Sequence, residues 1–307
     1  MPARTEIQAE INSIARKAQD DVRRSYLAKL HKHTKRNTVV YASAFGLTRK
    51  AQGVPPHLLS ILPDDVQGFM AAFHGLPAEP LDLILHSPGG SLEAAEQIVN
   101  YMRAKFPHIR AIIPQMAMSA ATMLACACDE IVMGKQSAIG PIDPQLTFPH
   151  TNGQLVTQPA QAILDEFEQA KAEIQQNPKL AAIWIPKLQG LPPGMLSRCK
   201  TTQDLAEEKV EGWLRDHMKL DSSAAAATAK WLANAKEHKT HGRPISAELA
   251  KAKGLNVTAL ELDQHLQDFV LSVFHATMVT FERTPCIKIF ENHQGKGSYL
   301  HAAMEKP

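Results

Sequence analysis

Apolar and charged residues alternate at helical spacing near both ends of the chain. A stripe of apolar residues within positions 1–36 predicts an amphipathic helix. Its members are Ile7, Ile11, Ile14, Ala18, Val22 and Leu27. A similar pattern from Leu260 to Phe281 predicts a last long helix. Beyond Glu291 no clear period is evident, which is typical of a mobile tail or an assembly segment.

Between these helices, short β-rich runs alternate with helical stretches. The runs cover residues 38–42, 81–86, 109–113 and 130–133. The helical stretches cover residues 64–73, 91–105 and about 119–128. Strands that alternate with helices predict parallel βαβ units joined by right-handed crossovers.

The chain changes character after Pro159. Residues 160–236 look almost wholly helical, with breaks near Pro178, Pro186 and 191–194. We therefore predict three parts. They are a helical extension over 1–36, a main domain over 37–258 with a helical insertion at about 160–236, and a C-terminal helix and tail over 259–307.

Composition narrows the class of protein. The 307 residues are 44% hydrophobic with a net charge of +2, which suits a large buried core and gives no reason to expect nucleic acid. The four cysteines lack zinc-binding spacing, and no metal or cofactor is predicted. The sequence shows no apolar leader and no run of about 18 apolar residues. We expect a cytoplasmic protein without a transmembrane segment.

Two segments that follow strands carry candidate chemistry. After the run 81–86, Gly89 and Gly90 let the backbone approach a ligand and aim N–H groups at it, although a purely structural turn has the same composition. Ser119 follows the run 109–113 and opens a helix, where the N–H of Ala120 has no helical partner. This arrangement suits a nucleophile with an adjacent oxyanion donor. The alternative is an ordinary serine N-cap.

A lysine on the helix 160–175 is a candidate base. Lys171 shares its side of the helix with Leu164, Phe167 and Ile174. Desolvation there would lower the lysine pKa from about 10.4 and supply a neutral amine that can deprotonate a serine. The alternative is that the side chain extends to water and stays charged.

Four segments together resemble the serine dehydrogenase proteinase family, which is similar to signal peptide peptidase A and the Clp proteolytic subunit. They are His86–Gly90, Met118–Ala121, Cys128–Met133 and Ile139–Gln145, with a further match at 240–245 and 250–257. The resemblance implies an α/β fold of the Clp/crotonase type. That fold is a repeated ββα superhelix with a parallel sheet, here with added N- and C-terminal helices.

The resemblance also implies roles for individual residues. Ser119 matches the nucleophile, and Gly90 and Ala120 match the donors of the oxyanion hole. Lys171, 52 residues after Ser119, matches the general base of a Ser–Lys dyad. The chain departs from its relatives in having Ala120-Ala121 where glycine commonly follows the serine.

A Ser-His-Asp triad is poorly supported by the residues near the expected position. The region around Asp143 has no histidine before His150, so we expect Asp143 to shape the pocket or to pair with a basic group. His86 precedes the glycine turn and has two alternatives, reaching the site or packing in the core.

The resemblance predicts an ATP-independent serine peptidase that acts on peptide or protein substrates and assembles as a homo-oligomer. No nucleotide-binding Walker motif is present. Two alternatives stay open, since fold does not fix function. They are a crotonase-type acyl-CoA enzyme and a catalytically silent assembly protein of the same fold.

Overall fold

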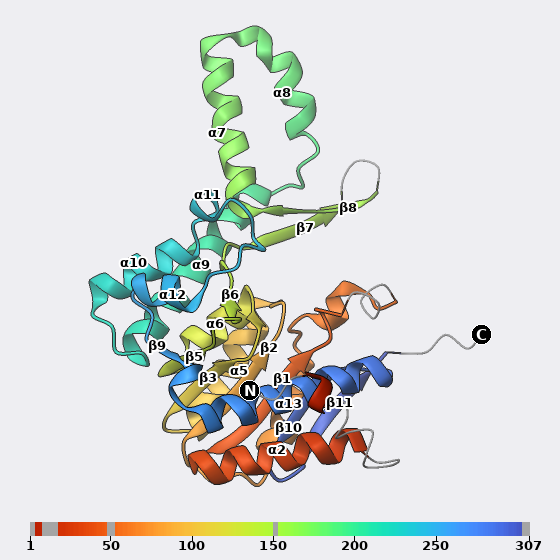
Figure 1. The fold of residues 1–307 in the computed structure, drawn as a ribbon. Helices are drawn as coiled ribbons and strands as arrows, with labels where there is room; N and C mark the ends of the chain where they lie inside the picture. The colour runs from red at the N-terminus through yellow and green to blue at the C-terminus, as the bar shows by residue number, and fades with distance from the viewer. Residues whose placement is uncertain (1–3, 8–17, 48–52, 150–152, 303–307) are drawn as a thin grey trace, which may run out of the picture.

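The computed structural model describes residues 4–7, 18–47, 53–149 and 153–302. Its centre is a seven-stranded sheet with helices on both faces (Figure 1). In sheet order the strands are β11 (Gly297–His301), β10 (Cys286–Asn292), β1 (Asn37–Ser43), β2 (Leu81–His86), β3 (Ile109–Ile113), β5 (Glu130–Met133) and β9 (Val257–Ala259). From β1 to β9 neighbouring strands are parallel, whereas β10 and β11 pair antiparallel. This mostly parallel sheet confirms the predicted α/β fold class.

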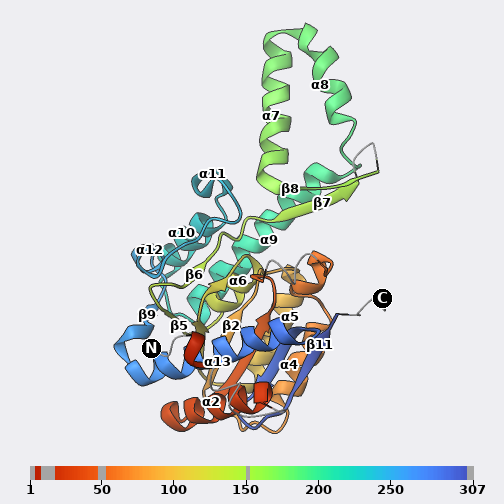
Figure 2. The ribbon, with the colours of Figure 1, turned by 45° about the vertical axis from the view of Figure 1, so that its right-hand side comes forward.

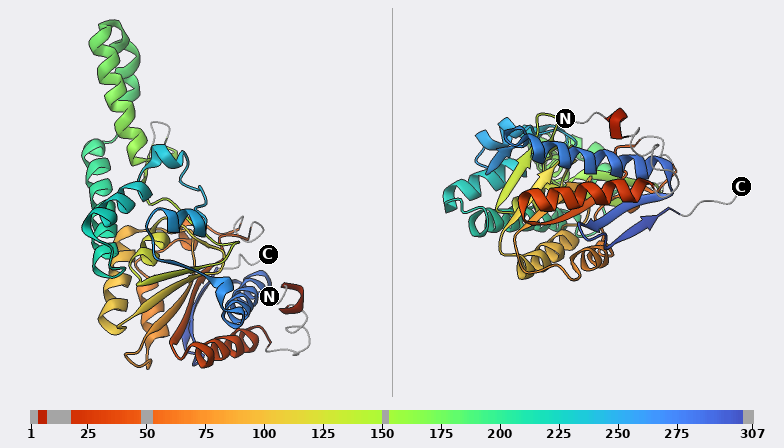
Figure 3. Two further views of the ribbon diagram at one scale, coloured as in Figure 1. Left: turned by 60° about the vertical axis from the view of Figure 1, so that its left-hand side comes forward. Right: turned by 60° about the horizontal axis from the view of Figure 1, so that its bottom comes forward.

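Two helical layers bury the faces of the sheet, as Figure 3 shows with the sheet edge-on. One layer consists of α4 (Asp65–Phe73), α5 (Leu92–Lys105) and α6 (Ala120–Cys126), which share a core with β2 and β3. The other consists of α2 (Ala18–Thr34) and α13 (Gln264–Arg283), which pack on the opposite face. Because both faces are covered, β1, β2 and β10 are buried along their whole length.

A buried ion pair fastens α2 to the body. The side chains of Arg23 and Glu291 are both fully buried, and Arg23 Nε lies 2.6 Å from Glu291 Oε2. The same guanidinium donates to the Thr280 hydroxyl of α13 at 2.9 Å. Asp20 also pairs with Arg23, and Arg24 also pairs with Glu291, each at 2.6 Å. This buried network holds α2, α13 and β10 as one unit.

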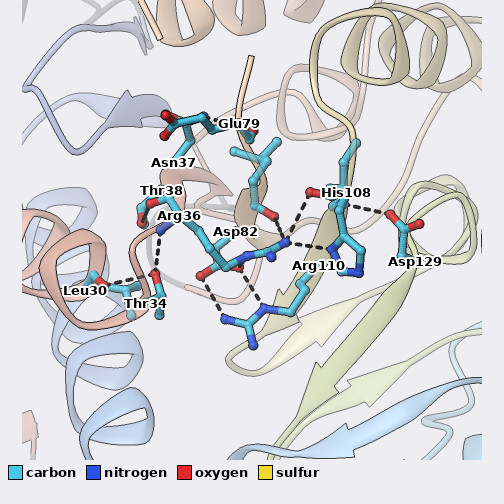
Figure 4. A network of polar contacts seen from close by, with 12 residues as sticks. Leu30, Thr34, Arg36, Asn37, Thr38, Glu79, Asp82, His108, Arg110 and Asp129 are labelled. Carbon is cyan, nitrogen blue, oxygen red and sulfur yellow. Dashed lines mark hydrogen bonds and ion pairs between the residues drawn. The ribbon is translucent and has the colours of Figure 1, made fainter. Parts of the chain in front are cut away.

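A second polar network lies at the amino ends of the parallel strands (Figure 4). Asp82, at the start of β2, is fully buried and accepts hydrogen bonds from Arg36 at 2.6 Å and from Arg110 at 2.8 and 2.9 Å. Arg36 also donates to the backbone carbonyl of His108 at 3.1 Å. Charge-assisted, partly bidentate bonds of this kind fix the register of β1, β2 and β3 at the end of the sheet away from the candidate site.

Helices fill the stretch after Pro159, as expected. A hairpin of β7 (Gln145–Pro149) and β8 (Leu155–Pro159) leads into α7 (Ala160–Gln176) and α8 (Ala181–Leu188), which project away from the sheet (Figures 1 and 2). The chain then returns through α9 (Met195–Asp216), whose Ala206 and Val210 join the core that includes α6. It continues through α10 (Ser222–Leu232), α11 (Ala235–His238) and α12 (Ala247–Ala252).

Two features differ from the sequence-based expectations. The segment after Glu291 is not an irregular tail, because β10 turns into β11 at the edge of the sheet. Pro186 lies inside α8 instead of ending it. Ala182, whose carbonyl loses its helical partner, is an exposed residue, which makes the proline tolerable. Among the described helices, none is long and apolar enough to cross a membrane.

Candidate active site

Backbone pairing brings the glycine turn and Ser119 together at the carboxyl end of the sheet. Ser87, just after β2, forms a parallel bridge with Ala117 of β4 (Met116–Ala117). The Ser87 N–H donates to the Met116 carbonyl at 3.1 Å, and the Met118 N–H donates to the Ser87 carbonyl at 3.0 Å. β4 in turn pairs with β6 (Ala138–Ile139). Ligands of open α/β sheets bind at this end of the strands.

Ser119 has an unusual backbone. Its φ is 52° and its ψ is −122°, and its side chain makes no capping hydrogen bond to α6. The alternative of an ordinary serine N-cap is therefore wrong. A non-glycine residue in such a conformation costs about 1–3 kcal/mol and persists only where the surrounding structure enforces it. The hydroxyl is left half-buried at the wall of a pocket.

The two glycines are required by close backbone contacts. A Cβ on Gly89, whose φ is +93°, would lie 2.6 Å from Ser119 Cβ and 2.8 Å from the Ala120 nitrogen. A Cβ on Gly90, whose φ is +153°, would lie 2.3 Å from the Ile61 carbonyl oxygen. Both distances are below van der Waals contact, so only glycine fits at either position. The turn is thus pressed against the backbone of the serine.

Two backbone N–H groups near Ser119 have no partner. Within the described parts of the chain, neither the Gly90 N–H nor the Ala120 N–H donates a hydrogen bond. Both residues line the same pocket as Ser119, which measures about 440 Å³. Free N–H groups beside a serine hydroxyl are the arrangement that can hold a developing oxyanion.

The remaining wall of the pocket comes from distant segments. It includes Glu93 at the start of α5, Gln145 at the start of β7, Arg198 of α9 and His241 from the loop before α12. A hydrogen bond from the Ser91 hydroxyl, helped by the charge of Arg198, lowers the pKa of Glu93. The pocket therefore carries both an acidic and a basic side chain.

Lys171 is not brought into this pocket. Its side chain is 56% exposed and lies 3.3 Å from Glu168 Oε2, and it is absent from the pocket wall. The buried residues of α7 are Ala160, Ile163 and Ala170. Of the two alternatives for Lys171, the structure therefore supports a side chain that extends to water. The physical reason is that α7 shares a buried cluster with α9 and β7 only near its start, through Ala160 and Ile163. Further along, where Lys171 lies, the helix projects away from the body (Figure 1).

His86 lies in the core and not in the pocket. It is fully buried between Phe45 and Phe274, with ring centroids 4.6 and 5.0 Å away. Burial lowers the pKa of His86 to about 3, so the ring is neutral. Of its two alternatives, the structure supports packing in the core.

His241 of the pocket wall pairs with a buried carboxylate, and the sequence does not predict this pair. His241 Nδ1 lies 2.9 Å from Asp143 Oδ1, and the Asp143 side chain is only 2% exposed. Asp143 thus pairs with a basic group, as expected, although its partner is 98 positions further along the chain. The sequence feature that points to His241 as a site residue is its position in segment 240–245, which resembles the family.

One protein family and two curated relatives match this chain. A family described as ClpP-like SDH-type serine proteinase matches residues 13–278. Two proteins of Methanocaldococcus jannaschii, each named as uncharacterized, are similar in sequence. MJ0137 is 32% identical over 67% of this chain and 63% of its own length, and MJ1495 is 31% identical over 63% and 58%. The chain thus spans about three fifths of the length of these relatives.

A solved structure also matches part of the chain. It is a serine-to-alanine mutant of 1510-N, a membrane-bound stomatin-specific protease. The match has 21% identity and a TM-score of 0.28, and it covers 38% of this chain and 58% of the other.

Proposed function

The chain belongs to the ClpP-like family of SDH-type serine proteinases, and from that premise we propose that it hydrolyses peptide bonds with Ser119 as the nucleophile. The observation that carries the proposal is the backbone of Ser119. A serine held at φ 52° without a capping role, against a glycine turn and in an open pocket, is arranged for attack on a bound carbonyl.

The proposed reaction is acyl transfer through a covalent intermediate. Ser119 Oγ attacks the substrate carbonyl carbon, and the resulting oxyanion accepts hydrogen bonds from the N–H groups of Gly90 and Ala120. One donor of this kind is worth about 10²–10³ in turnover. The acyl-enzyme is then hydrolysed by water. No cofactor is needed, and the substrate is a peptide or protein.

The resemblance assigns the base of this reaction to Lys171. That part of the proposal rests on the resemblance alone, because Lys171 is exposed and lies outside the pocket wall. The Ser119–Lys171 dyad is therefore what the resemblance implies, and labelling of Lys171→Ala tests it.

Labelling with a fluorophore-tagged fluorophosphonate tests the nucleophile. This reagent phosphonylates activated serines, so the purified full chain should be labelled and Ser119→Ala should not. Ser197→Ala is the matched control, since Ser197 is an exposed serine of α9 outside the pocket. Equal labelling of Ser119→Ala and the wild type would refute Ser119 as the nucleophile. Equal thermal unfolding of the two proteins would show that a lost signal is chemical and not structural.

A further inference from the structure

We propose that His241, oriented by Asp143, is the general base that activates Ser119. This inference rests on the proposed function and names the residues that complete the same site. His241 and Ser119 line one pocket of about 440 Å³ with the two proposed oxyanion donors, Gly90 and Ala120.

The backbone explains why Asp143 and His241 meet. Ile139 of β6 pairs antiparallel with Ile245, with N–H to carbonyl distances of 2.8 and 3.1 Å in the two directions. Asp143 follows Ile139 by four residues, and His241 precedes Ile245 by four. Because the two segments run in opposite directions, these positions lie side by side. β6 also pairs with β4, which leads directly into Ser119, so one short ladder connects all three residues.

Both sides of the His241 segment are anchored. Before it, the buried side chain of His238 lies with Nε2 2.8 Å from the Trp231 carbonyl oxygen, which holds α11 against α10. After it, Ile245 is fixed by its pairing with Ile139. A base held between two such anchors keeps its orientation without help from substrate.

The contacts of Asp143 determine the tautomer of His241. A carboxylate accepts hydrogen bonds and donates none, so the proton of the 2.9 Å contact belongs to His241 Nδ1. The other carboxylate oxygen, Oδ2, accepts from Gln145 Nε2 at 2.7 Å. Both oxygens of the nearly buried Asp143 are therefore engaged, and the His241 ring is left with its lone pair on Nε2.

An imidazole with a free Nε2 is the form that can take a proton from serine. Within the described residues the Ser119 hydroxyl makes no hydrogen bond, so its proton is not already committed to another acceptor. In unliganded enzymes the contact between nucleophile and base often tightens only when substrate binds. Lys171, by contrast, is engaged with Glu168 at the surface of α7.

The proton balance of the proposed cycle is complete. As Ser119 Oγ bonds to the carbonyl carbon, its proton moves to His241 Nε2 and the carbonyl electron pair moves to oxygen. Collapse of the oxyanion breaks the C–N bond, and the departing amine takes the proton from Nε2. Water then attacks the acyl-enzyme, gives a proton to Nε2, and the same proton returns to Ser119 as the acid product leaves.

Two assays on the purified full chain test the assignment. The first is the rate of fluorophosphonate labelling, and the second is hydrolysis of p-nitrophenyl acetate, a small activated ester. His241→Ala should lower both rates by about 10³-fold or more, and added imidazole should restore part of the activity. The control His74→Ala replaces an exposed histidine outside the pocket and should behave like the wild type.

Asp143 is tested as a positioning residue. Asp143→Asn keeps the shape of the side chain but lets it donate to Nδ1, which favours the wrong tautomer of His241. We expect kcat to fall by about 10²–10⁴-fold while KM stays unchanged. A purely structural role would instead lower the amount of folded protein and leave kcat per active site as it is.

The outcomes separate this inference from the proposed function. If the wild type is labelled at Ser119 and His241→Ala is labelled equally fast, His241 is not the base and the proposed function stands. Loss of labelling in Lys171→Ala alone would overturn the inference in favour of the Ser–Lys dyad. If the wild type is not labelled at all, the proposed function fails and this inference fails with it.

Discussion

Replacing Gly89 by alanine should disable the site through its backbone. In the wild type this glycine has a φ of +93°, and an added Cβ would lie 2.5 Å from the Met118 carbonyl oxygen and 2.6 Å from Ser119 Cβ. Carbon atoms in contact prefer about 3.5–4.0 Å. The turn and the serine must therefore separate by about 1 Å before an alanine fits.

The cost of Gly89→Ala has two parts. A positive φ costs an alanine about 1–2 kcal/mol relative to glycine. Forcing an extra methyl into a packed site adds about 1–3 kcal/mol. The free energy of unfolding should thus fall by about 2–5 kcal/mol in total. Activity should fall further, because a displacement of 1 Å at a reacting group can cost about 10²-fold in rate.

Gly194→Ala separates these two parts. Gly194 has a φ of +76°, and no atom lies within 4 Å of an added Cβ. An alanine at this position therefore has the cost of the positive φ without a steric cost. Urea unfolding should show a loss of about 1–2 kcal/mol for this control, with wild-type fluorophosphonate labelling. Gly89→Ala should unfold more easily and label at least about 10²-fold more slowly. Wild-type labelling of Gly89→Ala would refute the claim that the glycine turn is pressed against Ser119.

Three further predictions follow from the described contacts. Because burial lowers the pKa of His86 to about 3, the unfolded chain binds one more proton than the folded chain between that pH and about 6.5. The free energy of unfolding should therefore fall as the pH drops through this window, and it should fall less steeply in His86→Phe. Urea unfolding at several pH values measures both slopes. Glu291→Gln should cost about 3–5 kcal/mol, because the fully buried Arg23 then keeps only the half-exposed Asp20 as a counterion and Arg24 loses Glu291 as well. Lys171→Ala at an exposed pair should cost less than about 1 kcal/mol in the same assay. We also predict a homo-oligomer, and light scattering that reports only the monomer mass of 33.7 kDa at micromolar concentration would contradict it.

The parallel core could be predicted because its signals are local. The apolar runs at β2, β3 and β5 each end in turn residues, and the helix α5 begins at a serine that caps it, Ser91, whose hydroxyl accepts from the Ala94 N–H at 3.1 Å. Such features are contained within a few residues of sequence. They do not depend on which distant segment packs against them.

The edge hairpin could not be predicted in this way. β10 contains Lys288 and Glu291, which break the apolar pattern, yet both side chains are fully buried. Lys288 Nζ lies 2.8 Å from Asp65 of α4, and Glu291 pairs with Arg23 of α2. The partners that make these charges tolerable come from positions more than 200 residues away. A pattern of single residues does not reveal such pairs.

Some residues of the candidate site could be predicted from local patterns, and others could not. Ser119, Gly90 and Ala120 stand next to strands whose order follows from the βαβ rhythm, and the structure places them around one pocket. The spacing of apolar residues along α7 predicts which face of the helix carries Lys171. It does not show whether another segment packs against that face. His241 reaches the pocket through the pairing of Ile139 with Ile245, and no local period marks that long-range contact.

The hydroxyl of Thr122 connects the segments that flank Ser119. Thr122 donates its hydroxyl to the Ala117 carbonyl at 2.8 Å and accepts the Gly140 N–H at 2.9 Å. It thereby ties β4, α6 and the residue after β6 together, while the Ala121 N–H closes the turn on the Met118 carbonyl. A backbone carbonyl thus satisfies the Ala121 N–H, and the Ser119 side chain makes no capping hydrogen bond. A serine at a helix start that has a positive φ and makes no capping bond is therefore a more specific signal of a nucleophile than a serine at that position alone.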